Sequence, residues 1–356
     1  MVLPKPYKES YVPMPKDKGT TVVHTLYVAE YGNPDSRAPT VVILHGGPGV
    51  PSEPLMATLC DLRTTRVVLF DQRGCGLSTP LGSLVANTTR HHIEDIERLR
   101  KSMNWGEQIG VVGGSWGASL AVMYAATYPK HVKWYVVRGF CAVDSVNIFA
   151  PTIPLQYPEL WNTYTRLAYV TKFDKRHSTR KRSSTCASMT QRQCAMVYYH
   201  KLRERCANPP VTNNDPVMKY VDAWYNLEMF TLTANPKDTP KTTDPPLQRW
   251  VSALFEAHFY TRRFFVKRGY YEHHAASRLR KHNVPGTFIH GRQDVICNVA
   301  DSYDMYQWLT RGTKNSKTRL RIVEKAGHSY YDPRIRKAMK EEIIYILQKN
   351  DFVIDI

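Results

Sequence analysis

The stretch from residue 108 to residue 129 constrains the fold of this chain more than any other, because it contains no charged side chain. It is long enough to cross a bilayer as a helix. However, Gly110, Gly113, Gly114 and Gly117 precede a helical pattern of small apolar residues. Glycines in this arrangement indicate a buried strand, a tight turn and a buried helix, so we reject a membrane-spanning segment.

Short apolar runs alternate with helical patterns on both sides of this stretch. Residues 40–44, 66–70, 108–112 and 132–137 are rich in β-branched residues and are typical of buried strands. Residues 87–103 and 116–128 have the spacing of helices. Alternation of this kind predicts an α/β fold, a doubly wound and mostly parallel sheet with helices on its faces.

The alternation stops near residue 140 and resumes after residue 271. The intervening segment is aromatic-rich, punctuated by prolines and mainly helical in pattern, which predicts an inserted helical cap domain. Beyond it, 286–289 and 320–323 have strand patterns, and 302–309 and 335–348 have helical ones. We therefore expect a core built from residues 1–139 and 272–356, with a cap at 140–271.

The charge of the chain is positive and unevenly distributed. Lys and Arg number 49 against 31 Asp and Glu, a formal net charge of +18, while 42% hydrophobic residues exclude a mainly disordered chain. Ten of the cations lie in the basic tract 172–205. Such a cluster can attract nucleic acid, but no helix-turn-helix, zinc-finger or ribonucleoprotein signature accompanies it. We expect a solvated face or loop and no nucleic-acid partner.

Cysteine usage and the N-terminal sequence bear on the compartment. Seven cysteines form an odd set without CxxC or Cys/His metal spacing, which favours reduced thiols and predicts neither a disulfide framework nor a metal site. The first residues lack the basic patch and apolar run of a secretion signal. We expect a cytoplasmic protein without a membrane partner, and the sequence does not predict an oligomeric state.

A G-x-S-x-G motif at Gly113, Ser115 and Gly117 lies between the predicted strand and helix, the context in which a nucleophilic serine occurs. The simpler alternative is a glycine turn with a capping serine. A serine hydroxyl needs a histidine base and a carboxylate to orient that base. Asp294 and His328 follow later predicted strands in the order that this fold requires, which favours a catalytic triad.

Two further glycine-rich segments follow predicted strands. In LHGGPGVP, residues 44–51, consecutive glycines allow backbone N–H groups to approach an oxyanion, although the segment is also typical of an ordinary tight turn. We expect the N–H groups of Gly47 and Trp116 to form the oxyanion hole. In DQRGCGLS, residues 71–78, we expect Asp71 and Arg73 to brace the loop as an ion pair.

Five motifs in this order resemble the prolyl iminopeptidases, serine exopeptidases of the α/β-hydrolase fold that remove N-terminal proline. They are HGGPG, DQRGxGxS, NTTxxxxxDIERLR, GGSWGxSLA and HGRxD. The resemblance implies that Ser115, Asp294 and His328 form the triad, and that catalysis needs no metal or organic cofactor.

The resemblance also implies that glutamates in the cap bind the free imino terminus of the substrate. Glu228 in AWYNLEMFTL and Glu256 in FEAHFYTRRF lie in matching segments, and Arg138 could hold them ionised. The alternative is that all three form structural salt bridges. Phe140 and Phe149 are candidates for the pocket around the proline ring.

The resulting hypothesis is a cytosolic proline iminopeptidase that acts on short peptides. Two alternatives stay open: an esterase, amidase or lactonase with the same triad, and a non-catalytic protein that uses the basic tract to bind an anionic partner. An epoxide hydrolase or dehalogenase is disfavoured, because those enzymes have an aspartate where this chain has Ser115.

Overall fold

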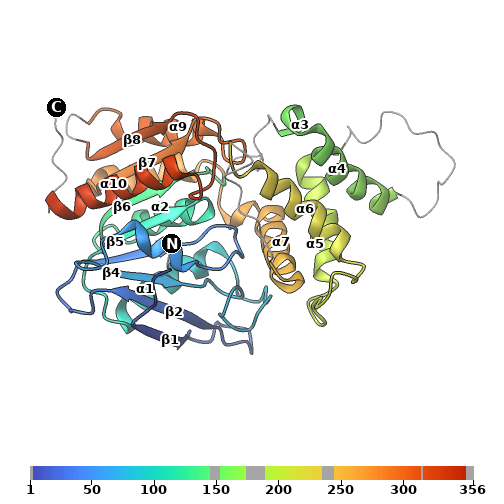
Figure 1. Ribbon diagram of the computed structural model, residues 1–356, viewed down its shortest axis with the longest axis horizontal. Helices are drawn as coiled ribbons and strands as arrows, with labels where there is room; N and C mark the ends of the chain where they lie inside the picture. The colour runs from blue at the N-terminus through green and yellow to red at the C-terminus, as the bar shows by residue number, and fades with distance from the viewer. Residues whose placement is uncertain (1–2, 145–152, 174–188, 235–243, 314–315, 350–356) are drawn as a thin grey trace.

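The computed structural model describes residues 3–144, 153–173, 189–234, 244–313 and 316–349. It consists of a sheet flanked by helices and a group of helices, α3 to α7, packed against one end of that sheet (Figure 1).

The described residues form one eight-stranded sheet in the order β1-β2-β4-β3-β5-β6-β7-β8. β2 is antiparallel to β1 and to β4, and every other neighbouring pair is parallel. The strands are β1 (Lys8–Pro13), β2 (Thr25–Gly32), β3 (Thr40–Leu44), β4 (Arg66–Phe70), β5 (Ile109–Gly114), β6 (Val132–Arg138), β7 (Gly286–Gly291) and β8 (Thr318–Val323).

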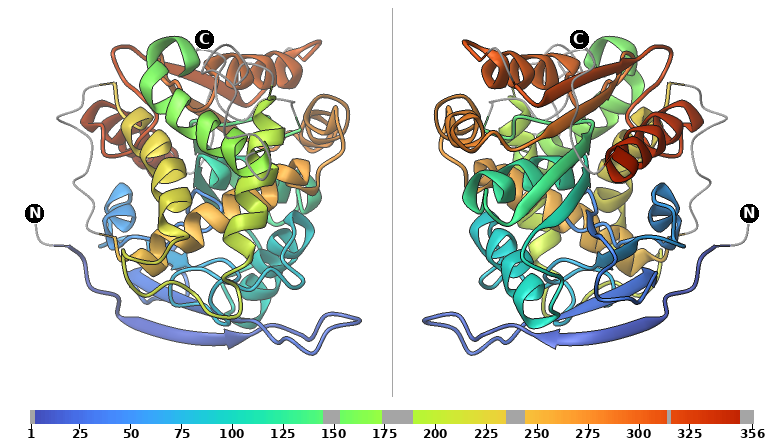
Figure 2. Two further views of the ribbon diagram at one scale, coloured as in Figure 1. Left: turned by 90° about the vertical axis from the view of Figure 1, so that its right-hand side faces the viewer. Right: turned by 90° about the vertical axis from the view of Figure 1, so that its left-hand side faces the viewer.

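Helices cover both faces of this sheet, which confirms the predicted doubly wound α/β architecture. From the core side, α10 (Pro333–Lys349) lies on one side of the sheet, and α1 (Thr89–Ser102) and α2 (Trp116–Thr127) lie on the other (Figure 2). Val42 and Leu44 of β3 belong to the hydrophobic core that includes α1 and α2. Val41 and Ile43 belong to the second core, with α10. Successive residues of a strand thus serve opposite faces.

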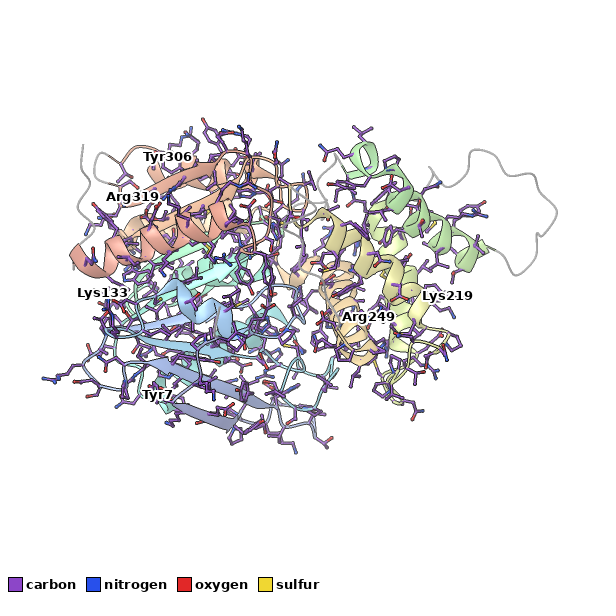
Figure 3. The ribbon with its side chains drawn as sticks, in the orientation of Figure 1. Tyr7, Lys133, Lys219, Arg249, Tyr306 and Arg319 are labelled. Carbon is purple, nitrogen blue, oxygen red and sulfur yellow. The ribbon has the colours of Figure 1, made fainter. Side chains whose placement is uncertain are left out.

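The cap helices lie between β6 and β7 in the chain. α7 is buried along most of its length, and its Phe255 reaches the core loops: a Cβ at Gly49 would lie 2.8 Å from the Phe255 Cβ. Arg249 of α7, labelled in Figure 3, forms an ion pair with Asp222 of α6. The cap helices are α3 (Ile153–Gln156), α4 (Pro158–Phe173), α5 (Gln191–Arg203), α6 (Met218–Thr231) and α7 (Pro246–Thr261).

Stacked and edge-on aromatic rings form the centre of the cap. The rings of Tyr164 (α4) and Tyr198 (α5) stack with centroids 4.6 Å apart, and Trp224 (α6) packs edge-on against Tyr198 at 5.6 Å. Such pairs contribute beyond their buried area. We propose residues 140–271 as the extent of the cap, because the chain returns to the sheet through η5 (Tyr270–Ala275) and α8 (Ala276–His282).

Only part of the basic tract is described, since residues 174–188 lie outside the described residues. In the remainder, Arg192 donates a 3.1 Å hydrogen bond to the Thr261 carbonyl, and Arg205 forms an ion pair with Asp215. These two cations therefore contribute to the internal contacts of the cap. Among the described helices, none combines the length and the apolar character that a membrane span requires.

Candidate active site

Ser115 occupies a sharp turn between β5 and α2. Its φ of 58° and ψ of −126° are unusual for a residue with a side chain and store backbone strain. Glycines permit the turn: a Cβ at Gly113 would lie 2.1 Å from the Gly117 carbonyl oxygen, and one at Gly117 would lie 2.2 Å from that of Leu44. The turn therefore holds the Ser115 hydroxyl at the carboxyl end of the sheet, at the N-terminus of α2.

Asp294 and His328 meet beside this turn. The His328 Nδ1–H donates a 2.7 Å hydrogen bond to Asp294 Oδ2, and the N–H groups of Ile296 and Cys297 donate to Oδ1 at 3.0 and 2.9 Å. With Nδ1 carrying the proton, Nε2 of His328 is the acceptor that a general base needs.

Close contacts with one short segment bring His328 to Ser115. The Ser115 N–H donates to the Arg138 carbonyl at 2.9 Å. A Cβ at the next residue, Gly139, would lie 2.9 Å from His328 Cε1. The segment 138–139 thus contacts the serine backbone on one side and the imidazole on the other, which places the two side chains at one end of the sheet.

Burial and neighbouring charges determine the protonation of this pair. Burial raises the pKa of Asp294, but the adjacent His328 and His290 outweigh it and the pKa lies below its usual range. Burial, together with the charges of Arg138 and His290, lowers the pKa of His328, and this outweighs the raising effect of Asp294. At neutral pH the pair is therefore a carboxylate and a neutral imidazole, as a general base requires.

The predicted oxyanion donors lie on either side of Ser115. Trp116 opens α2, so its N–H is one of the first-turn groups without an intrahelical acceptor. On the other side, a Cβ at Gly46 would lie 3.2 Å from the Ser115 Cβ, so the segment that contains Gly47 passes directly beside Ser115. This arrangement suits an oxyanion between the two backbone segments.

A buried polar network, which the sequence analysis did not predict, supports these donors. Gln72 Oε1 accepts a 2.8 Å hydrogen bond from the Trp116 indole N–H and lies 2.8 Å from His92 Nδ1. The Gln72 backbone N–H donates to His45 Nε2 at 2.9 Å, and its side-chain amide donates to the His45 carbonyl at 3.1 Å. Gln72 therefore connects Trp116, the residue after Ser115, to the HGGPG segment.

Asp71 and Arg73 do not form the predicted ion pair with each other. Asp71 instead accepts 2.7 Å hydrogen bonds from the backbone N–H and hydroxyl of Ser52. Arg73 is fully buried and forms ion pairs with Asp95 at 2.6 Å and Asp17 at 2.7 Å. The prediction was wrong because both partners of Arg73 are distant in sequence; each side chain nevertheless braces its loop.

Arg138 does not contact the cap glutamates, contrary to the prediction that it holds them ionised. Its Nη1 donates a 2.6 Å hydrogen bond to the His328 carbonyl, and a Cβ at Gly114 would lie 2.3 Å from its Nη2. The alternation of side chains along β6 directs Arg138 toward the turn at Ser115 and the loop that contains His328 rather than toward the cap. Its role is to position these two segments.

A cavity of about 50 Å³ brings Ser115 together with Glu228 and Glu256. Phe140 is absent from its wall, because it is fully buried against the Tyr271 and Phe288 rings, at 5.1 and 5.5 Å. Phe149 lies outside the described residues. The cavity is lined by Gly47, Pro48, Ser115, Trp116, Cys141, Val143, Trp224, Glu228, Glu256, Tyr260, Phe264, Ile296 and Cys297.

Glu228 and Glu256 form a pair of carboxyl groups that contact each other inside this cavity. The Trp224 indole N–H donates to Glu256 Oε2, and the two carboxyl groups are joined by a hydrogen bond, which requires a proton on one of them. Burial and the Glu228 charge hold the pKa of Glu256 well above its usual range, and burial also raises the pKa of Glu228. The pair therefore retains a proton more readily than exposed glutamates do.

The aromatic walls of the cavity were not predicted, although two of them carry a sequence signal. Trp224 and Glu228 are four residues apart on α6, and Glu256 and Tyr260 are four residues apart on α7. Residues with this spacing share one face of a helix. Extending each glutamate by one helical turn would thus have identified its aromatic neighbour, whereas Phe264 lies beyond the end of α7 and has no such signal.

The loop that contains His328 is joined to the cap by backbone hydrogen bonds. The N–H groups of His328 and Ser329 donate to the Leu232 carbonyl at 2.9 and 2.8 Å. Leu232 caps the C-terminus of α6, the helix that carries Glu228. Glu228 and the backbone of His328 are therefore held by the same element.

Comparisons with known proteins identify the family to which this chain belongs. A family model described as the alpha/beta hydrolase fold matches residues 39–334. A proline iminopeptidase from Arabidopsis thaliana is 31% identical over 324 residues, covering 88% of this chain and 74% of that protein. The chain belongs to the proline iminopeptidase family. A proline iminopeptidase from Xylella fastidiosa (strain 9a5c) is 29% identical, covering 87% of this chain and 89% of that protein.

Solved structures support the same fold at lower identity. A proline iminopeptidase-related protein from Thermus thermophilus is 17% identical with a TM-score of 0.53, covering 94% of this chain and 96% of that one. An esterase from Exiguobacterium antarcticum is 16% identical with a TM-score of 0.56, covering 91% and 96%. At these identities the likeness establishes the α/β-hydrolase fold and does not distinguish a proline iminopeptidase from an esterase.

Proposed function

We propose that the protein is a serine aminopeptidase that releases proline from the N-terminus of short peptides. The observation that carries this proposal is the shared cavity, in which Ser115 lies with the carboxyl pair Glu228 and Glu256. A cationic substrate terminus needs a negative partner in a buried site, and two carboxyl groups supply one. An ester or amide without a free amino group has no such requirement. Membership of the proline iminopeptidase family supports the same activity.

Catalysis begins at Ser115. His328 Nε2 accepts the hydroxyl proton as the oxygen attacks the carbonyl carbon of the N-terminal residue. The N–H groups of Gly47 and Trp116 stabilise the oxyanion, and His328 then donates its proton to the departing amine. A prolyl ester of Ser115 results. His328 next activates a water molecule that cleaves the ester and releases proline, while Asp294 stabilises the imidazolium in both steps.

The carboxyl pair matches the N-terminus of a proline peptide in charge and in donors. A protonated secondary amine carries one positive charge and two N–H donors. The pair Glu228 and Glu256 with one shared proton carries one negative charge, and its oxygens are acceptors. Binding therefore neutralises the charge in a water-poor cavity, where an unpaired charge would be costly.

The cavity walls favour an exopeptidase. Trp224, Tyr260 and Phe264 line the region of the two glutamates, and the cavity volume is only about 50 Å³. A residue preceding the proline would have to occupy the space of these rings and would remove the charge that the glutamates bind. We therefore propose short peptides with a free N-terminal proline as substrates. A cytosolic location and the absence of a nucleic-acid partner remain predictions from the sequence.

Hydrolysis of a panel of aminoacyl reporter amides tests the proposal. We expect preference for the proline amide over the alanine and leucine amides, no turnover of N-acetyl-proline amide, and no activity in Ser115→Ala. Turnover of small esters with none of proline amides would support the esterase alternative instead. Inactivity on both, with anionic binding lost when the basic tract 172–205 is neutralised, would support the binding-protein alternative.

A further inference from the structure

Two cysteine thiols meet in the wall of the candidate active site. Cys141 follows β6, and Cys297 lies three residues after Asp294 in the loop after β7. Both line the cavity that contains Ser115, and their side chains are hydrogen-bonded to each other. Neither thiol takes part in the proposed reaction, so the pair has no role assigned by the mechanism.

The surroundings keep both groups as thiols in the resting protein. The hydrogen bond with Cys141 and burial hold the pKa of Cys297 well above its usual range. For Cys141 the hydrogen bond with Cys297 lowers the pKa, but burial and the carboxylates of Asp301 and Asp294 outweigh it and the pKa is raised. Because the thiolate is the nucleophile, this pair reacts slowly and survives ordinary exposure to oxygen.

The two thiols differ in their access to small molecules. Cys297 is buried, whereas Cys141 is partly exposed. Hydrogen peroxide is small enough to reach Cys141 through the cavity. Cys297 is the neighbouring thiol in the same cavity wall and can therefore complete a disulfide with Cys141 after a local movement of the two loops.

We propose that Cys141 and Cys297 are a redox modification site at which hydrogen peroxide forms an intramolecular disulfide that inactivates the enzyme. In the first step the Cys141 sulfur attacks one peroxide oxygen, the O–O bond breaks, and a sulfenic acid and one water molecule form. In the second step the Cys297 sulfur attacks the Cys141 sulfur, the S–O bond breaks, and a second water molecule leaves. Two thiols lose two electrons and two protons, and one molecule of peroxide is reduced to two of water.

The consequence for activity follows from the position of Cys297. Its backbone N–H donates the 2.9 Å hydrogen bond to Asp294 Oδ1 that helps to orient the catalytic carboxylate. A covalent bond between sulfurs that are now only in hydrogen-bond contact draws the loop after β7 toward the loop after β6. That movement displaces Asp294 and, through it, His328. We expect turnover to fall on the order of 10- to 100-fold, the cost of a small misplacement of a catalytic group.

The test treats reduced protein with hydrogen peroxide, removes the peroxide, and maps the cysteine peptides without reduction. The expected result is a cross-linked Cys141–Cys297 peptide whose mass is lower by two hydrogen atoms, formed in step with the loss of activity and reversed by dithiothreitol. Cys141→Ser and Cys297→Ser should each resist inactivation, every variant being compared with its own reduced form. Cys206→Ser, which changes an exposed thiol, is the matched control and should stay sensitive.

Phenylarsine oxide provides a second measurement, because it bridges two neighbouring thiols and releases water. It should inactivate the wild type and Cys206→Ser but neither single variant of the pair. Absence of the cross-linked peptide, or equal inactivation of Cys141→Ser by peroxide, would overturn the proposal.

The loss-of-activity part of this inference rests on the proposed function. Labelling of Ser115 with a fluorophosphonate reports on the triad without a peptide substrate. A cross-link that suppresses labelling in a protein without prolyl activity would refute the proposed function and leave the redox site standing.

Discussion

Glu256→Gln tests imino-terminus recognition with little disturbance of the fold. The Trp224 indole N–H donates to Glu256 Oε2, so the amide oxygen of the new residue takes that position. The amide NH₂ must then occupy the place of Oε1, which receives no hydrogen bond from an N–H or O–H group of the described residues. There it can donate to Glu228. In the wild type the shared proton can lie on either carboxyl group, so Glu256 can accept from a substrate cation, whereas the amide NH₂ of the variant stays a donor.

The expected magnitude follows from the loss of one charged hydrogen bond. Hydrogen bonds to charged groups contribute about 1.5–3 kcal/mol, which corresponds to a decrease of roughly 10- to 150-fold in kcat/KM. Hydrolysis of a reporter ester without an amino group should be unchanged, because this substrate makes no use of the pair. Glu204→Gln, an exposed position in the same cap, is the matched control and should leave both activities unchanged.

Thermal unfolding shows whether a lost activity reflects lost structure. Because burial and the Glu228 charge raise the pKa of Glu256, this residue contributes stability below the usual carboxyl pKa and loses it as the pH rises toward its own value. Glu256→Gln should thus unfold at the same or a higher temperature than the wild type near pH 8. Equal losses of ester and proline-amide turnover in a stable variant would refute the recognition role, as would an unchanged kcat/KM for the proline amide.

Four further outcomes are expected. Asp294→Asn should lower kcat by about 10⁴-fold for esters and amides alike, because His328 no longer keeps its proton on Nδ1. A stopped assay measures this loss, and near-normal turnover would contradict the triad. The acid limb of the pH profile of ester hydrolysis should have its midpoint below the ordinary histidine pKa of about 6.5. The reason is that burial lowers the pKa of His328 and only the neutral imidazole is a base. A midpoint above that value would contradict the role of His328. Gln72→Leu should lower kcat roughly tenfold with KM unchanged, because the Trp116 indole loses its acceptor. Gln72→Glu keeps an acceptor and should retain more activity. Equal effects of the two variants would argue against a role of Gln72 in positioning Trp116. Gly117→Ala should cost about 1–3 kcal/mol in a denaturant titration, because its Cβ would lie 2.2 Å from a carbonyl oxygen of β3; unchanged stability would contradict the close packing.

Local patterns were sufficient to predict the parallel part of the sheet. The predicted strands 40–44 and 66–70 coincide with β3 and β4, because strands buried on both faces are continuous apolar runs. The antiparallel strands β1 and β2 were missed. β1 is exposed along much of its length and shows no continuous apolar run. Its place is determined by pairing with β2, a long-range interaction that its own residues do not reveal.

The same distinction applies to the site. Ser115, Asp294 and His328 each follow a strand, and parallel strands end at one edge of the sheet, so their chain order was informative. The partners of Arg73 and Arg138 were predicted wrongly, because each depends on which face of a buried segment the side chain occupies. Gln72 was missed for a related reason: its partners come from three separate segments, and no short motif encodes their meeting.

The two hydrogen bonds from the histidine loop to the carbonyl of Leu232 limit how this enzyme can be re-engineered. In many designs a cap is treated as an interchangeable module that sets specificity while the core retains the chemistry. Here Leu232, the C-cap residue of α6, also supports the backbone of His328, so a transplanted cap would have to reproduce that single carbonyl in register. Shortening or rotating α6 by one residue would move Glu228 and the imidazole of His328 together. In this chain, a change to α6 therefore cannot alter specificity without also altering reactivity.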